Sequence, residues 1–205
     1  MGFLNELTTV TTNNNEDDEV RQRILETALH LFADYGLRRT TMEDVASRCG
    51  IGRATLYRRF RDKDQLFQAV IFGEMRRNLV LINESVKSQS NALDGLIEAF
   101  VKAANLSYTH PLLSRLLDSE PETVLPYLTR DLGMSMEFAS RFLTSHIQNA
   151  QAKGVLSNRS PSLLSEMVLR LVQSLVLSPS PQVNPADEES LRAFANVCLR
   201  PVLAP

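Results

Sequence analysis

The segment TTMEDVASRCGIG, residues 40–52, constrains the fold more than any other part of the chain. Its first five residues contain two overlapping capping-box patterns, which predict that a helix begins there. Ala46 precedes Gly50 by four positions. This spacing suits two helices that cross closely around a turn, because the small residue allows close contact and the glycine tolerates unusual backbone angles. The segment therefore predicts a helix-turn-helix.

The helix expected after this turn, RATLYRRF at residues 53–60, is short and strongly basic. From Arg38 to Lys63, eight basic residues stand against three acidic ones, which makes this window +5 in a chain of net charge −2. The rest of the chain is therefore −7. Such an asymmetry is typical of a DNA-binding module joined to a neutral or acidic domain. Leu56 and Phe60 are predicted to be core residues that hold the short helix in place.

Helical spacing of apolar residues continues from residue 17 to the end of the chain, and no stretch alternates as a strand would. We therefore predict an all-α protein of roughly nine helices. Residues 1–16, rich in Thr and Asn, are predicted to be a disordered arm. A DNA-binding helix-turn-helix domain is predicted at residues 17–62, and a larger helical domain at 63–205.

Composition excludes several classes of protein. The small net charge argues against a protein that coats nucleic acid or membrane over its whole surface. The N-terminus lacks the basic start of a signal peptide, and no apolar run reaches the roughly 18 residues of a membrane span. We therefore expect a cytoplasmic protein with no membrane partner.

Sequence patterns of catalysis and of cofactor or metal binding are not found. The three histidines are isolated, and Gly50-Ile51-Gly52 follows a predicted helix, whereas a dinucleotide fingerprint follows a strand. We predict no enzyme activity, no cofactor and no metal. Cys49 and Cys198 are far apart in the chain, and we predict that both are reduced thiols in the core. A redox sensor at Cys49, beside Arg48, is an alternative left open.

The stretch TTMEDVASRCGIGRATLYRRFRDKDQLFQAV resembles the DNA-binding domain of the TetR family of bacterial transcriptional repressors. The matching features are the Thr that opens the first helix of the motif, the turn glycine, the TLYxxF core and the Lys that follows it. The match covers about residues 20 to 70. Gly52 departs from the family, in which many members have Ser as the cap of the recognition helix, and glycine is tolerated there with a modest loss.

This resemblance implies a DNA contact for each of several residues. Thr41, at a helix N-terminus, would bind a phosphate. Arg53 and Thr55 would reach base edges in the major groove, where Arg53 suits guanine. Tyr57 would touch a phosphate or a thymine methyl group. Three further cations would bind phosphates and so position the protein: Arg58, Arg59 and Lys63.

The predicted helix from Ser162 to Leu177 carries two neighbouring apolar stripes, which begin at Leu163 and at Leu164. So wide an apolar surface must be covered on more than one side. Either the helix is fully central in a monomer, or it pairs with a second copy in a four-helix bundle, as the resemblance implies. We predict a homodimer. The predicted interface residues are Leu164, Val168, Val172, Val176, Leu191, Phe194 and Cys198.

The resemblance also implies that the second domain binds a small inducer, which its apolar character suggests is hydrophobic. The predicted pocket residues are Met75, Leu79, Phe100, Tyr108, Leu112, Leu116, Phe138, Phe142 and Leu171. The function so implied is a repressor that binds palindromic operator DNA as a dimer and is released by ligand. The alternative is a DNA-binding regulator without a small-molecule inducer, either an activator or a protein controlled by a protein partner.

Overall fold

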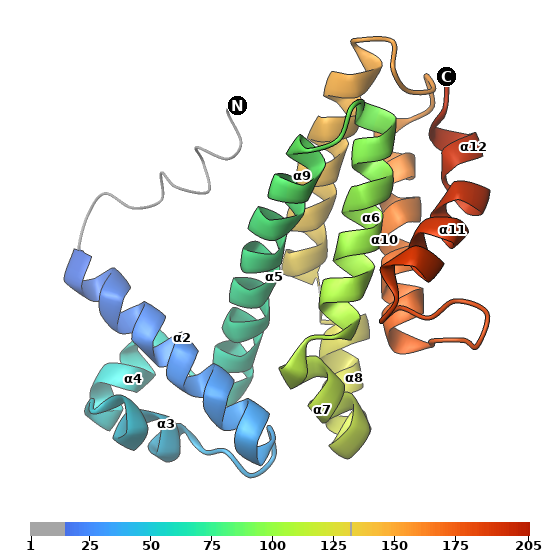
Figure 1. Ribbon diagram of the computed structural model, residues 1–205. Helices are drawn as coiled ribbons and strands as arrows, with labels where there is room; N and C mark the ends of the chain where they lie inside the picture. The colour runs from blue at the N-terminus through green and yellow to red at the C-terminus, as the bar shows by residue number, and fades with distance from the viewer. Residues whose placement is uncertain (1–14, 132) are drawn as a thin grey trace. The chain divides into compact units, whose positions relative to one another are not determined.

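The computed structural model describes residues 15–131 and 133–205, and every regular element in these residues is a helix (Figure 1). No strand is present in this part of the chain, which confirms the predicted all-α class. Of the predicted arm, residues 1–14 lie outside the described residues, and residues 15–16 begin the first described helix. The helices are α2 (Asn15–Tyr35), α3 (Met42–Cys49), α4 (Arg53–Arg59), α5 (Lys63–Lys87), α6 (Ala92–Tyr108), α7 (Pro111–Ser119), α8 (Pro121–Thr129), α9 (Gly133–Gln151), α10 (Pro161–Leu177), α11 (Glu188–Cys198) and α12 (Arg200–Leu203).

The described residues contain eleven helices, against the roughly nine predicted. One of them, α8, continues to Thr129 although it contains Pro126. A proline inside a helix removes one backbone hydrogen bond. Here the loss is tolerated, and Val124 and Leu128, on either side of the proline, are buried and hold the helix in place.

The chain forms two compact units. Unit 1 contains the described residues through Glu74 together with Arg115–Thr129. Unit 2 contains Met75–Ser114 and the described residues of Arg130–Pro205. The predicted boundary lies after residue 62, with residues 115–129 in the second domain. The division differs because residues 115–129 contact the N-terminal helices, and contacts between segments so distant in the chain leave no local sequence pattern.

Unit 1 has an aromatic and aliphatic core shared by its helices. Ile24 and Phe32 of α2 are fully buried, as are the predicted core residues Leu56 and Phe60. The ring of Phe32 meets that of Phe67 on α5 edge to face, with ring centroids 5.5 Å apart. Each such side chain contributes about 1.5–3 kcal/mol by burial. The short helix α4 is therefore fixed to the rest of unit 1 by apolar contacts.

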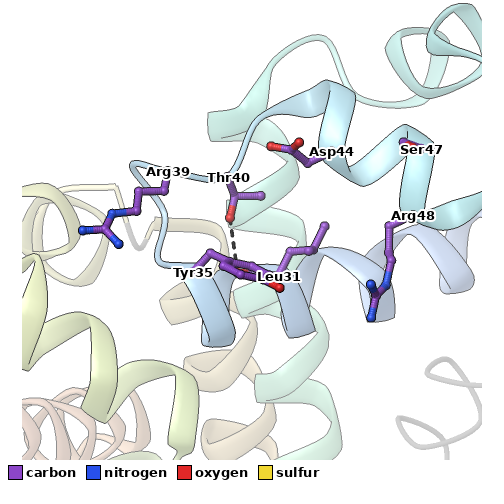
Figure 2. A pocket seen from close by; sticks show the side chains of 7 residues that line it. All are labelled: Leu31, Tyr35, Arg39, Thr40, Asp44, Ser47 and Arg48. Atoms are coloured by element: carbon purple, nitrogen blue, oxygen red, sulfur yellow. Dashed lines mark hydrogen bonds between the residues drawn. The ribbon is translucent and has the colours of Figure 1, made fainter.

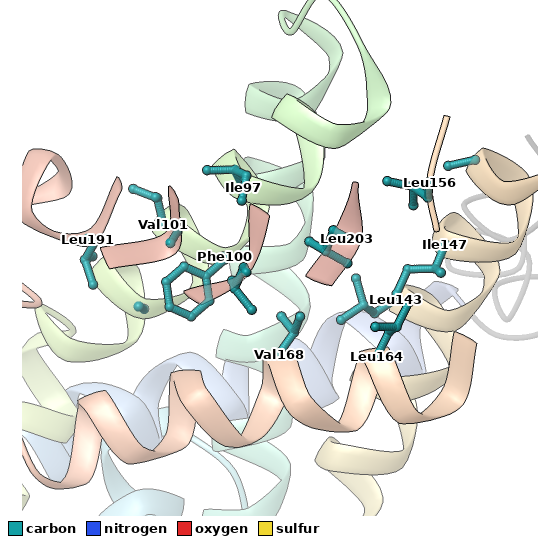
Figure 3. Packing of buried hydrophobic residues seen from close by; sticks show 14 of the residues in the cluster. Ile97, Phe100, Val101, Leu143, Ile147, Leu156, Leu164, Val168, Leu191 and Leu203 are labelled. Atoms are coloured by element: carbon teal, nitrogen blue, oxygen red, sulfur yellow. The ribbon is translucent and has the colours of Figure 1, made fainter. Parts of the chain in front are cut away.

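Unit 2 is built around a cluster of buried apolar side chains from α6, α9, α10, α11 and α12 (Figure 3). Phe100 and Val101 of α6 face Val168 of α10 and Leu191 of α11 within this cluster. The rings of Phe100 and Phe194 are stacked with centroids 6.3 Å apart. Both stripes of α10 contribute to this cluster: Leu164 and Val168 of one stripe and Leu175 of the other are buried, whereas Leu163 is 70% exposed.

A row of polar contacts joins one face of α6 to α11 and α12. Its positions on α6 follow one another at intervals of three or four residues, so they share one face of the helix. The three ion pairs are Asp94–Arg200 at 2.6 Å, Glu98–Arg192 at 2.7 Å and Lys102–Glu188 at 2.6 Å. The Arg200 guanidinium holds the pKa of Asp94 below its ordinary value. Asn105 extends the row by donating to the carbonyl of Pro185 at 3.1 Å. These contacts set the register of α11 on α6.

The described residues show few groups suited to covalent or metal chemistry. Among them, no helix is both long and apolar enough to cross a membrane. No three described His, Cys, Asp or Glu side chains gather as metal ligands would. Cys49 and Cys198 are free thiols, Cys49 is buried, and burial raises the pKa of Cys198. A buried thiol is poorly reactive, which disfavours Cys49 as a redox sensor.

Candidate nucleic-acid interface

Helix α3 begins with one of the two capping boxes that the sequence offered. The Thr41 hydroxyl oxygen accepts from the backbone N–H of Asp44 at 3.2 Å, and the Asp44 carboxylate accepts from the N–H of Thr41 at 2.9 Å. The carboxylate also accepts from the Thr41 hydroxyl, and these bonds lower the pKa of Asp44. The neighbouring Thr40 is buried and donates instead to the carbonyl of Gly36 at 2.8 Å. Thr40 thus closes the end of α2, and Thr41 opens α3.

The turn between α3 and α4 has the backbone that the glycine pattern predicted. Gly50 has a φ of +69°, in the left-handed region that residues other than glycine rarely adopt. The N–H of Ile51 donates to the carbonyl of Ala46 at 3.0 Å, which closes the last turn of α3. Gly52 then precedes α4 in an extended conformation, without a side-chain cap. The turn therefore fixes the direction in which α4 leaves α3.

Helix α4 presents a basic face outward. Its inner side is held by Leu56 and by Phe60 directly after the helix, which are 0% and 1% exposed. Because residues four apart share a helix face, the residues between them point elsewhere. Arg53, Tyr57 and Arg58 are exposed, and Thr55 is half-buried. These are four of the residues predicted to contact DNA.

Arg59, predicted to bind a phosphate, has internal partners instead. Its side chain is only 10% exposed, and its guanidinium pairs with Asp17 on α2. It also donates to the carbonyl of Thr55 at 3.4 Å. Arg59 therefore joins α4 to α2. The sequence could not reveal this role, because the ion pair links residues 42 positions apart.

Lys63 also differs from its predicted role. Its ammonium group donates to the carbonyls of Leu37 at 2.8 Å and Thr40 at 3.1 Å, in the connection between α2 and α3. An ammonium has three donors, so these bonds leave little capacity for a phosphate. Asp62 caps the helix that begins at Lys63, since its carboxylate accepts from the N–H of Gln65 at 2.8 Å.

An acidic residue that the sequence patterns did not assign to the site lies beside the predicted base-reading arginine. Glu43, the second residue of α3, has a carboxylate oxygen 3.6 Å from Nη1 of Arg53, the first residue of α4. Both side chains reach solvent, with 72% of Arg53 and 40% of Glu43 exposed. The only sequence signal was the capping-box pattern, which explains Glu43 by helix formation alone. The pair spans the turn of the helix-turn-helix.

A groove of about 380 Å³ lies between α2 and α3 (Figure 2). Leu31 and Tyr35 of α2 form one side, and the Thr40 hydroxyl donates to the carbonyl of Leu31 at 3.2 Å within it. Figure 2 shows Arg39 and Arg48 at its two ends. Both cations therefore add to the positive charge of the helix-turn-helix.

The predicted dimer residues fall into two groups. Leu164, Val168 and Leu191 are buried in the core of unit 2, and Val176 is 9% exposed, so these side chains do not form its surface. Val172, Phe194 and Cys198 are half-buried. The exposed apolar side chains on these two helices are Leu163 at 70% and Val197 at 79%. Three of the four α10 residues predicted at the interface are thus buried within one chain.

The predicted ligand residues are mostly buried within the protein. Leu116 belongs to unit 1, and the other eight belong to unit 2. Phe100 is part of the unit 2 core and Leu171 packs against it. Phe142 is buried beside His146, with ring centroids 4.3 Å apart. Their role in ligand binding stays a prediction.

The helix-turn-helix and the chain as a whole are similar to known proteins. The family model for bacterial regulatory proteins of the tetR family matches residues 24–70. An uncharacterised HTH-type transcriptional regulator of Mycobacterium bovis is 26% identical over 165 residues, which cover 80% of this chain and 84% of that protein. A TetR-family regulator from Pectobacterium atrosepticum has a similar structure, with a TM-score of 0.72 at 19% identity over 95% of this chain and 99% of that one. The repressor AlkX of a Dietzia strain, implicated in biodegradation of n-alkanes, has a TM-score of 0.67 at 21% identity over 89% and 96% of the two chains.

Proposed function

Because the chain belongs to the TetR family of bacterial regulatory proteins, we propose that it represses transcription in the cytoplasm by binding a palindromic operator as a homodimer. A small apolar inducer would release it from the DNA. The observation that carries the proposal is the outward basic face of α4, which two buried side chains hold on the rest of unit 1. A short helix so fixed suits insertion into the major groove.

The proposed DNA contacts follow from the exposure of each side chain. Arg53, at the start of α4, reads a guanine through two hydrogen bonds to its O6 and N7 atoms. Thr55 lies beside it, and Tyr57 and Arg58 bind the DNA backbone. Thr41 places the N-terminus of α3 against a phosphate. Arg59 and Lys63 act on DNA indirectly, by holding α4 and the start of α3 in place.

We expect Arg53→Ala to lower operator affinity by about 1–3 kcal/mol and to relax the preference at one base pair in each half-site. Arg58→Ala is the matched control. It should weaken all sequences similarly and lower the salt dependence of binding, because it removes a phosphate contact. Fluorescence anisotropy with an operator selected from random DNA measures both effects. If Arg58→Ala loses the base preference and Arg53→Ala keeps it, the two roles are exchanged.

The proposed dimer uses the outer faces of α10 and α11. Leu163 and Val197 are the large apolar side chains most exposed on these helices, and Met167 lies one turn after Leu163. Contiguous exposed apolar surface is typical of an interface between proteins, and we place the interface around these side chains. A two-fold dimer also places two copies of α4 in successive half-sites, about 34 Å apart. Palindromic DNA and a symmetric protein then match.

We expect the wild-type protein to have twice the 23.0 kDa chain mass in light scattering, and Val197→Glu to have the mass of one chain. The two-fold axis brings a buried charge from each copy to the same interface, and neither has a counter-ion. Val80→Glu is the matched control, since Val80 lies on α5 and is 52% exposed. If Val197→Glu stays dimeric, the interface lies elsewhere.

The inducer is proposed to bind within unit 2, whose interior is apolar. AlkX, which is similar in fold, is implicated in n-alkane biodegradation, so fatty acids and alkanes are sensible first probes. Each probe is added to the protein on its operator, and release is followed by anisotropy. Release by one of them at micromolar concentration supports the proposal. If no small molecule releases the protein, the alternative of a regulator controlled by a protein partner, or of an activator, is favoured.

A further inference from the structure

The ion pair between Glu43 and Arg53 joins the beginnings of the two helices of the DNA-binding motif. The separation of Arg53 Nη1 from Glu43 Oε1, 3.6 Å, is longer than a hydrogen bond. The pair is therefore electrostatic. Arg53 keeps its planar fork of N–H donors available for a ligand, while the carboxylate limits the directions in which the fork can point.

A carboxylate at this place has a cost for DNA binding. Glu43 is 40% exposed on the surface that carries Arg53, and DNA phosphates would repel it there. Its position in the first turn of α3 gives it one structural role, which is a favourable interaction with the helix dipole. Asp44 already supplies a negative charge in the same turn and completes the capping box. The contact with Arg53 is a second role, which helix formation does not require.

We propose that Glu43 is a specificity-determining residue, which positions the Arg53 guanidinium to read one guanine in each half-site. This inference rests on the proposed DNA-binding function. In the free protein the ion pair restricts the Arg53 side chain, so less conformational freedom is lost when it meets the base. On DNA that lacks this guanine, the Glu43 carboxylate still repels the DNA phosphates, but Arg53 gains no compensating contact with a base. Glu43 therefore lowers non-specific affinity and increases discrimination at the base pair that Arg53 reads.

The test compares full-length variants on DNA. The operator is first selected from a random library with the wild-type protein, and each base of one half-site is then varied in competition binding. The variants are Glu43→Gln, Glu43→Ala, Arg53→Ala and the double variant Glu43→Ala with Arg53→Ala. Glu26→Gln on α2 is the control, because it removes the same charge from an exposed site on another helix. The melting temperature of each variant is recorded.

We expect both Glu43 variants to lose about two- to fivefold of discrimination at the position that Arg53 reads, which is the range for an exposed ion pair. Their non-specific affinity should rise at low salt. In the Arg53→Ala background, Glu43→Ala should leave base preference unchanged, since there is no longer a side chain to position. Glu26→Gln should keep the wild-type preference.

Three results would overturn the inference, and they differ from one another. Unchanged discrimination in Glu43→Gln and Glu43→Ala, with only a shift in melting temperature, would show that Glu43 acts on helix stability alone. A changed preference at a different base pair would show that Glu43 reads a base itself, for example by accepting from a cytosine amino group. If the wild-type protein selects no sequence, the proposed function fails together with the inference.

Discussion

Gly36→Ala is expected to lower the free energy of unfolding by about 2–4 kcal/mol. Gly36 has a φ of +87°, and a Cβ atom added to it would lie 2.1 Å from Oε1 of Glu120. The left-handed backbone alone costs a side chain about 1–2 kcal/mol. The contact adds to this because Glu120 cannot move freely. It is 9% exposed, and its other carboxylate oxygen accepts from the N–H of Arg38 at 2.9 Å. Moving it leaves that N–H without its acceptor, at a cost of about 1–3 kcal/mol.

Urea unfolding followed by circular dichroism measures this effect, with all proteins at one concentration because the proposed dimer would make stability depend on concentration. Gly73→Ala is the matched control. Gly73 lies inside α5, where an added Cβ meets nothing within 4 Å, so alanine should stabilise the protein by about 0.5–1 kcal/mol. Opposite signs for the two glycines are therefore expected. A Gly36→Ala variant as stable as wild type would mean that Glu120 and the backbone relax at almost no cost.

The contrast between Gly36 and Gly50 shows which features of this fold can be predicted from sequence. Both have positive φ, but only Gly50 lies in a local pattern that predicts a turn, because Ala46 precedes it by four residues. Caps and turns depend on residues within about four positions, so the helix-turn-helix and the end of α3 were predictable. Gly36 directly follows the last residue of α2. Its close contact with Glu120 depends on a segment more than 80 residues away, which no local pattern encodes.

The internal partners found at the candidate site were unpredictable for the same physical reason. Arg59 and Lys63 are residue types that commonly bind phosphates. In this structure, however, their partners are Asp17 on α2 and backbone carbonyls in the connection after α2. The apolar stripes of α10 are alike in sequence, and only the positions of the neighbouring helices decide which residues of each stripe are buried. Periodicity identifies an apolar face without identifying what covers it. The charge of the motif was thus predictable, and the partner of each charge was not.

The second large effect is expected from Arg192→Ala, which should lower the free energy of unfolding by about 2–3 kcal/mol. Glu98 on α6 is 8% exposed, and Arg192 on α11 donates to its carboxylate at 2.7 Å. This hydrogen bond raises the pKa of Arg192. Removing one partner of a buried ion pair costs about 3–5 kcal/mol, because the other charge is left uncompensated. The expected value is lower here since the Arg192 side chain is 41% exposed.

Two further variants separate the cost of the unpaired charge from the loss of a surface contact. Arg141→Ala removes an exposed ion pair with Glu137 on α9 and should change stability by no more than about 0.5 kcal/mol. Glu98→Gln, added to Arg192→Ala, should restore part of the lost stability, because a neutral amide needs no counter-ion. If the added Glu98→Gln destabilises the protein further, the carboxylate has found another partner, and the cost of Arg192→Ala is not that of an uncompensated charge.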